Sequence, residues 1–290
     1  MHGTGNDFVV YVDFDERTTP DIVKRICIIH TGIGADGVIA VSKSRTLKAK
    51  YRMKYFNSDG SLGEMCGNGI RCFAKYLLDN KLINKKGKVS VDTDAGIIIP
   101  NVLENSEKEA LIRVDMGKPV FYNAEQIIKR RSKDGSVHFA FSLTSRDGKK
   151  HKLDGVYIGI GNPHAVFFVE KGNAAKYARE FGPQIEVMTN IFPQKTNVEF
   201  VEVNNRKELT MYVWERSVGL TLACGTGACA VLVAAVLQGY SERIAKIQLL
   251  GGALEISWDR NDSHVFMTGP AVNVFTISNF VIKGNKKNLS

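Results

Sequence analysis

The chain has 290 residues, 44% hydrophobic and 24% charged, which is typical of a globular protein long enough for two domains. Five cysteines cannot all pair in a disulfide framework, and the first ten residues lack the basic and apolar regions of a secretory signal, so we expect free thiols in a cytoplasmic protein. The net charge of +9 comes from separated basic clusters, and none has the aromatic interleaving expected of a surface that stacks single-stranded bases, which argues against nucleic-acid binding.

In chain order, sequence features of the first half recur in the second half. The loop Gly3-Thr4-Gly5-Asn6 returns as Gly159-Ile160-Gly161-Asn162, 156 positions later (159 minus 3), and each copy precedes a β-rich stretch. A helix follows in both halves. We predict one over Pro20 to His30, after the N-cap Thr19, and one over Ala174 to Phe181, between the cap Asn173 and the stop Gly182-Pro183.

Each half then has an alternating strand that ends nine residues before a cysteine. The first ends at Asn57, before Cys66, and the second at Glu215, before Cys224 (66 minus 57 and 224 minus 215). Both cysteines open a Cys-Gly-x-Gly turn that leads into an apolar segment, which predicts a helix starting at each cysteine.

A cysteine at a helix N-terminus lies next to free backbone N–H groups and the positive end of the helix dipole, so we expect a lowered thiol pKa at both sites. The N–H groups at Gly67-Asn68 and Gly225-Thr226 could bind a carboxylate. A single Cys-Gly-x-Gly is as often an ordinary buried cysteine, but its duplication favours a pair of reactive thiols. For the remaining helical cysteines, Cys72 and Cys229, we expect packing in the core.

Strands on both sides of each helix argue against a Rossmann sheet and favour a mixed α/β fold, in which each half is a mostly antiparallel sheet around a central helix. Residues 228–237 are apolar on every side and too short to span a membrane, so this helix should be fully enclosed. Arg71 and Lys75 give the equivalent helix of the first half a polar stripe, so we expect it to be less completely enclosed. We expect domains over residues 1–117 and 118–272, with residues 273–290, including a strand over Val274 to Ile282, returning to the first domain.

Together, these motifs resemble the diaminopimelate epimerase family over nearly the whole chain. The matching segments are Met1-His2-Gly3-Thr4-Gly5-Asn6-Asp7-Phe8, Gly32-Ile33-Gly34-Ala35-Asp36-Gly37, Phe56-Asn57-Ser58-Asp59-Gly60-Ser61, Met65-Cys66-Gly67-Asn68-Gly69, Gly161-Asn162-Pro163-His164, Thr196-Asn197, Trp214-Glu215-Arg216 and Ala223-Cys224-Gly225-Thr226-Gly227. The resemblance implies two pseudo-symmetric domains with the active site in the cleft between them. It also implies a homodimer, no pyridoxal phosphate or other cofactor, and no metal.

The implied reaction interconverts LL- and meso-diaminopimelate. Inversion needs a base on one face of Cα and an acid on the other, and the resemblance assigns these roles to Cys66 and Cys224. It assigns the tuning of both thiols to His164 and Glu215. The implied substrate-binding residues are Asn6, Asn57, Gly67, Asn68, Asn162, Asn197, Glu215, Arg216, Gly225 and Thr226.

Two positions depart from the family pattern. Ser217 stands where the family usually has glycine, which puts the backbone behind Arg216 in question, and Gly37 stands where some members have glutamine. Two alternatives remain: a racemase of the proline racemase type, and an amino-acid-binding relative without turnover. Proline racemases tend to have histidine after Met-Cys-Gly, where this chain has Asn68, and they do not need the pair Glu215-Arg216.

Overall fold

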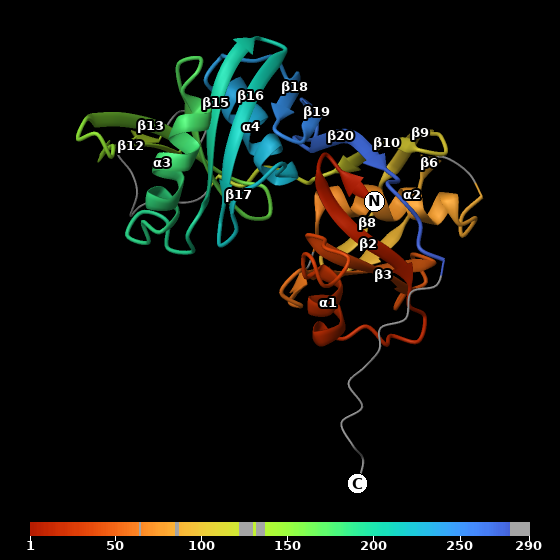
Figure 1. The fold of residues 1–290 in the computed structure, drawn as a ribbon. Helices are drawn as coiled ribbons and strands as arrows, with labels where there is room; N and C mark the ends of the chain where they lie inside the picture. Colours follow the sequence, from red (N-terminus) through yellow and green to blue (C-terminus); the bar gives the residue numbers. More distant parts are fainter. Residues whose placement is uncertain (64, 85–86, 122–129, 132–136, 279–290) are drawn as a thin grey trace.

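The structure is a computed structural model that describes residues 1–63, 65–84, 87–121, 130–131 and 137–278 (Figure 1). These residues form a mixed α/β fold with four helices and twenty strands in one large mixed sheet. None of the helices in the described residues is long and apolar enough to cross a membrane.

The first half contains ten strands and two helices within the described residues. Their bounds are β1 His2–Gly3, β2 Asn6–Val12, α1 Pro20–Cys27, β3 Gly37–Lys43, β4 Tyr51–Asn57, β5 Leu62–Gly63, α2 Gly67–Asp79, β6 Gly87–Lys88, β7 Val91–Thr93, β8 Gly96–Ile98, β9 Asn101–Asn105 and β10 Glu109–Asp115.

The second half has the same numbers of strands and helices among the residues described. Their bounds are β11 Arg130–Arg131, β12 Val137–Thr144, β13 Lys150–Gly159, β14 Pro163–Phe168, α3 Ala174–Glu186, β15 Asn197–Asn205, β16 Glu208–Glu215, β17 Gly219–Leu220, α4 Gly225–Leu237, β18 Ile244–Leu249, β19 Gly252–Trp258 and β20 Val265–Val272.

The strand pairings of the two halves correspond. In the first half β2 and β3 are parallel, with Val10 opposite Ile39, and in the second half β14 and β15 are parallel, with Val166 opposite Glu199. The antiparallel pairs β3–β4 and β15–β16 follow in the same order. The repeated sequence features therefore lie at corresponding positions of the sheet.

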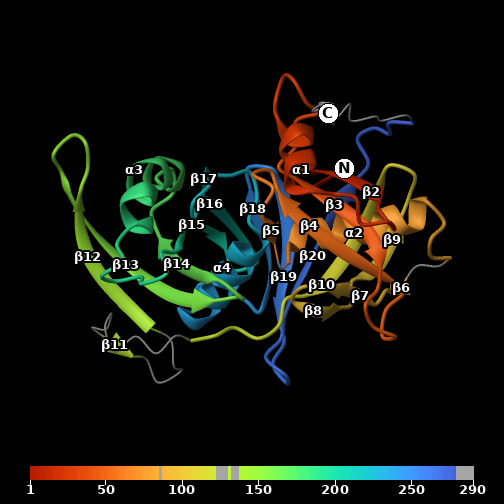
Figure 2. The ribbon, with the colours of Figure 1, turned by 90° about the horizontal axis from the view of Figure 1, so that it is seen from below.

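Strand β20 connects the two halves of the sheet. It pairs antiparallel with β10 along its length, from Glu109 opposite Val272 to Asp115 opposite Phe266, and with β19 on its other side. Strands β19 and β20, drawn in blue, run between two lobes (Figure 2). The two lobes are thus held together by continuous backbone hydrogen bonds.

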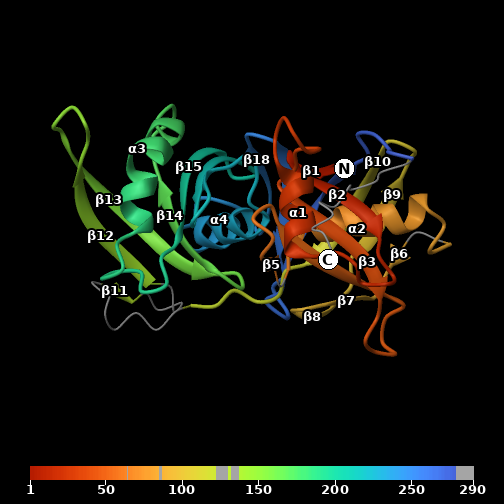
Figure 3. The same ribbon diagram turned by 60° about the horizontal axis from the view of Figure 1, so that its bottom comes forward.

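Helices α2 and α4 each lie inside a curved part of the sheet (Figure 3). For α4 the prediction of full enclosure is confirmed from Gly227 to Ala235, which are all buried, but not for Val236 and Leu237, which are half-buried. The prediction that α2 is less enclosed is wrong, because the side chains of Arg71 and Lys75 are both 0% exposed. Burial is tolerated because both side chains are hydrogen bonded: Arg71 to Thr4 and to backbone oxygens, and Lys75 to Asp79 and to backbone oxygens.

Helices α1 and α3 pack on the outside of the sheet, and both differ from their predicted lengths. As predicted, α1 starts after the cap Thr19, whose Oγ1 accepts from the amide of Ile22, but it ends at Cys27 because Ile28 is extended. The predicted stop at Gly182-Pro183 is wrong, since α3 continues to Glu186. Gly182 instead allows close packing, because a Cβ there would lie 2.5 Å from Cβ of Trp214.

The C-terminal segment returns to the first half without forming the expected strand in the part described. Residues 274–278 have no regular secondary structure, and residues 279–282 of the predicted strand lie outside the described residues. The amide of Asn273 donates to the carbonyl of Lys108 at 2.8 Å. This bond places the start of the segment beside β10.

Candidate functional site

Cys66 is the N-cap of α2. Its backbone is extended (φ −135°, ψ 116°), and its Sγ accepts from the amide of Gly69 at 3.3 Å. A Cβ on Gly69 would lie 3.5 Å from that sulfur, so glycine leaves the thiol room at the helix end. Cys66 is half-buried.

Cys224 occupies the corresponding N-cap position of α4, with similar backbone angles (φ −129°, ψ 108°). Its Sγ lies 3.5 Å from Oγ1 of Thr226, and the residue is 4% exposed. The prediction of two cysteines that each begin a helix is thus confirmed in its geometry.

The two helix N-termini meet at Met267 of β20. A Cβ on Gly67 would lie 2.9 Å from Cε of Met267, and a Cβ on Gly225 would lie 2.9 Å from its Sδ and 3.6 Å from Oδ1 of Asn68. The glycines therefore allow both helix ends to lie close to one buried side chain. The N–H groups in the first turn of a helix can bind an anion.

The prediction that the helix ends lower the thiol pKa values is wrong for the protein without substrate. Burial raises the pKa of Cys66, although the amides of Gly69 and Asn68 act in the opposite direction. Burial also raises the pKa of Cys224 well above its usual value, and the carboxylates of Glu215 and Glu199 raise it further. The cost of burying a thiolate exceeds the stabilisation that the helix N–H groups provide.

On the first-half side, two asparagines lie next to Cys66. Oδ1 of Asn6 accepts from Nδ2 of Asn68 at 3.2 Å and lies 3.9 Å from Sγ of Cys66. Nδ2 of Asn6 donates to Asp36 at 2.7 Å. The buried Oδ1 of Asn68 has no hydrogen-bond partner within the described part of the chain, so this acceptor is available to a ligand.

On the second-half side, Glu215 lies beside Cys224 at the end of β16. Its Oε1 accepts a short hydrogen bond from Oγ1 of Thr221, and burial raises the pKa of Glu215. His164 is fully buried on β14, with Nε2 2.8 Å from Oδ1 of Asn162. A half-buried carboxyl group thus lies beside Cys224, and a histidine lies near that carboxyl group.

Asn197, at the start of β15, forms hydrogen bonds to the backbone of two neighbouring segments. Its Nδ2 donates to the carbonyl of Pro163 at 2.9 Å, and its Oδ1 accepts from the amide of Arg216, also at 2.9 Å. Asn197 therefore fixes the backbone that carries both His164 and Arg216.

Arg216 and Asn57, two residues expected to bind substrate, form hydrogen bonds to other parts of the protein. Nη1 of Arg216 donates to the carbonyl of Gln194 at 2.9 Å, and Asn57 is bonded to Tyr55 and Ser61. No hydrogen bond joins either side chain to a cysteine among the residues that the structure describes. Substrate contact by Arg216 requires its side chain to leave Gln194.

The two departures from the family pattern have local structural effects. Ser217 adopts φ +64°, in the left-handed region that glycine favours, and its amide donates to Oε1 of Glu186 at 2.9 Å. The turn behind Arg216 is thus kept by a strained serine. Gly37 has no space for a larger residue here, because a Cβ would lie 2.5 Å from the carbonyl oxygen of Phe56.

Three residues near the cysteines were not identified from the sequence. Glu199 lies next to His164, Thr221 binds Glu215, and Met267 separates the two helix ends. Glu199 could have been found by aligning the two halves, because its counterpart in the β2–β3 pair is apolar Ile39. Met267 and Thr221 carry no comparable signal, since their contacts depend on how the two halves pack.

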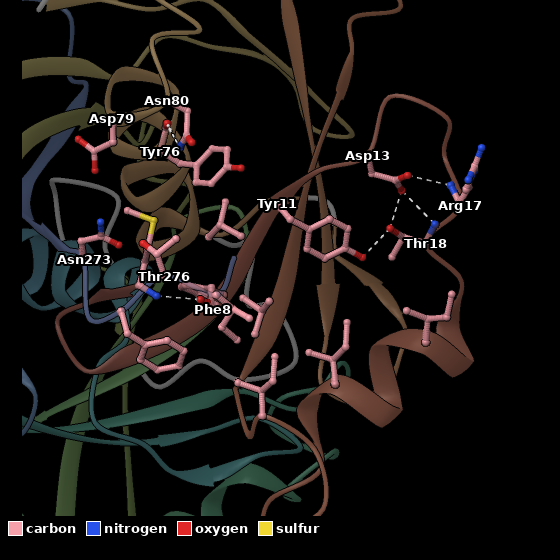
Figure 4. A pocket seen from close by; sticks show the side chains of 18 residues that line it. Phe8, Tyr11, Asp13, Arg17, Thr18, Tyr76, Asp79, Asn80, Asn273 and Thr276 are labelled. Atoms are coloured by element: carbon pink, nitrogen blue, oxygen red, sulfur yellow. Dashed lines mark hydrogen bonds between the residues drawn. The ribbon is translucent and has the colours of Figure 1, made fainter. Parts of the chain in front are cut away.

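A cavity of about 910 Å³ lies away from the cysteines, in the first half, and its lining includes Tyr11, Asp13 and Thr18 from the β2–α1 region (Figure 4). Three of the polar groups drawn there bond one another, because Thr18 Oγ1 bonds both Asp13 and Tyr11. Its other walls come from the end of α2 and from residues 273–277. We do not assign the reaction to this cavity, because its lining includes neither cysteine.

Within the described ranges, no group of three or more histidine, cysteine, aspartate or glutamate side chains is arranged to hold a metal ion. The free groups near the cysteines are thiols, amides and carboxylates, which can transfer protons and bind an amino acid.

Comparison with known structures shows the same fold at low sequence identity. A probable proline racemase from Agrobacterium radiobacter superimposes with a TM-score of 0.63 at 14% identity, covering 99% of this chain and 93% of that one. A PhzF-family phenazine biosynthesis protein from Bacillus anthracis gives 0.65 at 15% identity, covering 94% and 92% of the two chains. At these sequence identities, the two structures show that the mixed α/β fold is shared, and they show nothing about function.

Comparison of sequences is more specific. The family model for diaminopimelate epimerase matches residues 1–122 and 156–274. The diaminopimelate epimerase of Acetivibrio thermocellus is 45% identical over 278 residues, which are 95% of each chain, and that of Methanococcus maripaludis is 43% identical over 95% of this chain and 96% of its own. With matching cysteine sites at two helix ends and relatives of this similarity over nearly its full length, the chain belongs to the diaminopimelate epimerase family.

Proposed function

We propose that the protein is an isomerase that interconverts LL- and meso-2,6-diaminopimelate in lysine and peptidoglycan precursor biosynthesis. The observation that carries this proposal is the meeting of two cysteine-capped helix N-termini at Met267, in a chain 45% identical to a diaminopimelate epimerase. A thiol on each side of one anion-binding region is the arrangement that inversion at an α-carbon requires.

Proton transfer runs between Cys66 and Cys224. One sulfur, as thiolate, takes the α-proton from one face of the carbon, while the other, as thiol, donates a proton to the opposite face. Negative charge builds on the substrate's α-carboxylate, and the N–H groups at Gly67 and Gly225 stabilise it. This scheme uses only side chains and backbone of the protein.

Binding of the substrate also brings a positive charge to the thiols. The α-ammonium group brings a positive charge between two buried thiols and favours ionisation of one of them. His164 and Glu215 tune the cysteines: beside burial, Glu215 raises the pKa of both Cys224 and Cys66, and His164 interacts with Glu215. The free acceptor Oδ1 of Asn68 is suited to the ammonium group.

The distal end of diaminopimelate carries a second ammonium and carboxylate. We assign the carboxylate to Arg216, whose guanidinium can bind it through two hydrogen bonds after leaving Gln194. The remaining polar contacts to the substrate come from four asparagine side chains, which are Asn6, Asn57, Asn162 and Asn197.

We assign residues 1–117, with 273–290, to one domain and residues 118–272 to a pseudo-symmetric second domain, with the active site in the cleft between them. The matching registers of β2–β3 and β14–β15 support this assignment. We further infer a cytoplasmic homodimer. From Val9 to Tyr11, β2 has β3 as its one strand partner among the described residues, and we place the second copy at its other edge.

A racemase of the proline racemase type is the second candidate, because such a protein shares the fold. Asn68 after Met-Cys-Gly and the pair Glu215-Arg216 favour the epimerase. The test is incubation of the protein with LL-diaminopimelate, and separately with L-proline, in deuterated water. We expect the meso isomer and α-deuterium with diaminopimelate alone. Exchange into proline alone would support the racemase, and exchange into neither would support a binding protein.

A further inference from the structure

Glu199 is a fully buried carboxylate that the proposed reaction does not use. It lies on β15 with 0% exposure, and its Oε1 is 2.6 Å from Nδ1 of His164. A Cβ on Gly227 would lie 2.8 Å from the same oxygen, so the carboxylate lies against the first turn of α4. Glu199 therefore adjoins both His164 and the helix that Cys224 caps.

The fold does not require a charged pair at this position. By register, Phe8 of β2 corresponds to His164 of β14, and Ile39 of β3 corresponds to Glu199 of β15. Phe8 and Ile39 are both buried, and Ile39 lies under Gly69 just as Glu199 lies under Gly227. The same position is thus filled by an apolar pair in one half and by a carboxylate and a histidine in the other.

His164 contacts an oxygen atom on each side of its ring. Its Nδ1 faces a carboxylate oxygen of Glu199, and its Nε2 faces the amide oxygen of Asn162 at 2.8 Å. Carboxylate and amide oxygens both accept, so these two contacts together fit a ring in which each nitrogen donates a proton. A fully buried imidazolium needs a counter-charge, which Glu199 provides at 2.6 Å.

We propose that Glu199 is a positioning residue: its carboxylate holds His164 as an imidazolium, and the imidazolium holds the amide of Asn162 with its NH2 group free to donate to the substrate. This inference rests on the proposed function, in which Asn162 binds diaminopimelate. Glu199 acts through His164 and Asn162 and does not touch the substrate itself.

Other charged groups near this pair come from two neighbouring elements. Glu215 at the end of β16 interacts with both His164 and Glu199, and Cys224 at the start of α4 interacts with Glu199. Glu215 already bonds Thr221, so Glu199 is the carboxylate that pairs with the ring. Loss of Glu199 would leave the ring without its hydrogen-bonded counter-ion, and the ring would release a proton. Asn162 would then turn to donate its NH2 group to the bare ring nitrogen.

The test is Glu199→Gln, which keeps the shape of the side chain and removes its charge. Nitrogen chemical shifts of the histidine ring, measured at neutral pH without substrate, should show two protonated nitrogens for His164 in the native protein and one in the variant. The KM for diaminopimelate should rise by roughly tenfold or more, the effect of losing a hydrogen bond to a charged group, with a smaller change in kcat.

Glu202→Gln is the matched control. Glu202 lies on the same strand and accepts from the amides of Gly172 and Ala174. Its loss should lower the melting temperature without changing the His164 ring or the KM. If both variants change only stability, or if His164 keeps both protons in Glu199→Gln, Glu199 is merely structural and the proposal is wrong.

A double variant, His164→Phe with Glu199→Ile, copies the apolar pair of the first half and keeps the kinetic test available if Glu199→Gln does not fold. A raised KM supports the proposal, and an unchanged KM overturns it. The ring measurement needs no turnover. A native protein that holds His164 doubly protonated but does not epimerise diaminopimelate would therefore refute the proposed function and leave the Glu199 contact established.

Discussion

Behind Cys66 the protein buries a cation, whereas beside Cys224 it buries carboxylates. Arg71, one turn into α2, partly offsets the effect of burial on the Cys66 thiol, and the position of α4 that corresponds to Arg71 is the neutral residue Cys229 (71 plus 158). Glu215 raises the pKa of both thiols, and Glu199 raises that of Cys224 further. Two sites with the same backbone thus have different electrostatic surroundings.

Cys66 and Cys224 occupy equivalent positions of the internal repeat. The difference in the charged groups around them gives them unequal roles. Burial raises the pKa of both thiols, but the pKa of Cys224 is raised well above its usual value. Burial lowers the pKa of Arg71 to about 10, which still leaves it charged at neutral pH. We therefore expect Cys66 to ionise first and Cys224 to hold the proton in the free enzyme.

The largest effect is expected when either cysteine is removed. Cys66→Ala and Cys224→Ala should each reduce epimerisation in both directions by roughly 10²–10⁴-fold, the usual contribution of a general acid or base. Conversion of LL- to meso-diaminopimelate and the reverse would be measured for each variant. The control is Cys72→Ala, which removes a buried core thiol and should retain activity. Near-native turnover in either variant would contradict the use of two thiols.

Arg216→Met should have the next largest effect. Each hydrogen bond from a charged group to the distal carboxylate is worth about 1.5–3 kcal/mol, so kcat/KM for diaminopimelate should fall roughly ten- to a hundredfold or more. Deuterium exchange into an amino acid without the distal group should not fall. Unchanged kinetics with diaminopimelate would place Arg216 outside the site.

Arg71→Met tests the electrostatic difference directly. Without the cation the pKa of Cys66 should rise further, so alkylation of Cys66 at neutral pH should slow several-fold while that of Cys224 changes less. The variant also leaves the acceptors on Thr4 and Pro270 unpaired, at a stability cost of about 1–3 kcal/mol. Equal slowing at both thiols, measured by mass spectrometry, would show that the two sites are not distinguished by Arg71.

The pH dependence of the native enzyme follows from the same pKa directions. The reactive form has one thiolate, and because both thiol pKa values are raised, this form becomes more abundant as the pH increases above neutral. We expect kcat/KM to increase toward alkaline pH and to fall once the second thiol also ionises. A profile that is flat from neutral pH upward would mean that a thiolate is already fully formed in the free enzyme.

The smallest effect is expected for Ser217→Gly. Relief of the left-handed backbone should be largely offset by the greater freedom of glycine in the unfolded chain, for a net stabilisation below about 1 kcal/mol. Ser263→Gly is the matched control, because Ser263 has φ +62° in another loop. If Ser217→Gly alone changes the KM for diaminopimelate, the turn behind Arg216 affects substrate binding as well as stability.

Much of the framework could be predicted because it depends on local signals. The cap Thr19, the helix starts at Cys66 and Cys224, and the matching order of strands all follow from short sequence patterns. Arg71 could not be placed correctly, because its burial depends on acceptors from Thr4 and Pro270, which are far from it in sequence. The sign of the thiol pKa shift was also missed, since burial is a property of the packed molecule.

The long-range pairing of β10 with β20 has a consequence for how the protein is made. Ala110 lies opposite Ala271, so β10 has its strand partner on that side only after nearly the whole chain has been synthesised. Until then, a folded first half would expose the edge of β10, where another chain could pair with it and start aggregation. Completion of the first half is thus coupled to the last strand of the second, and the two halves cannot mature independently.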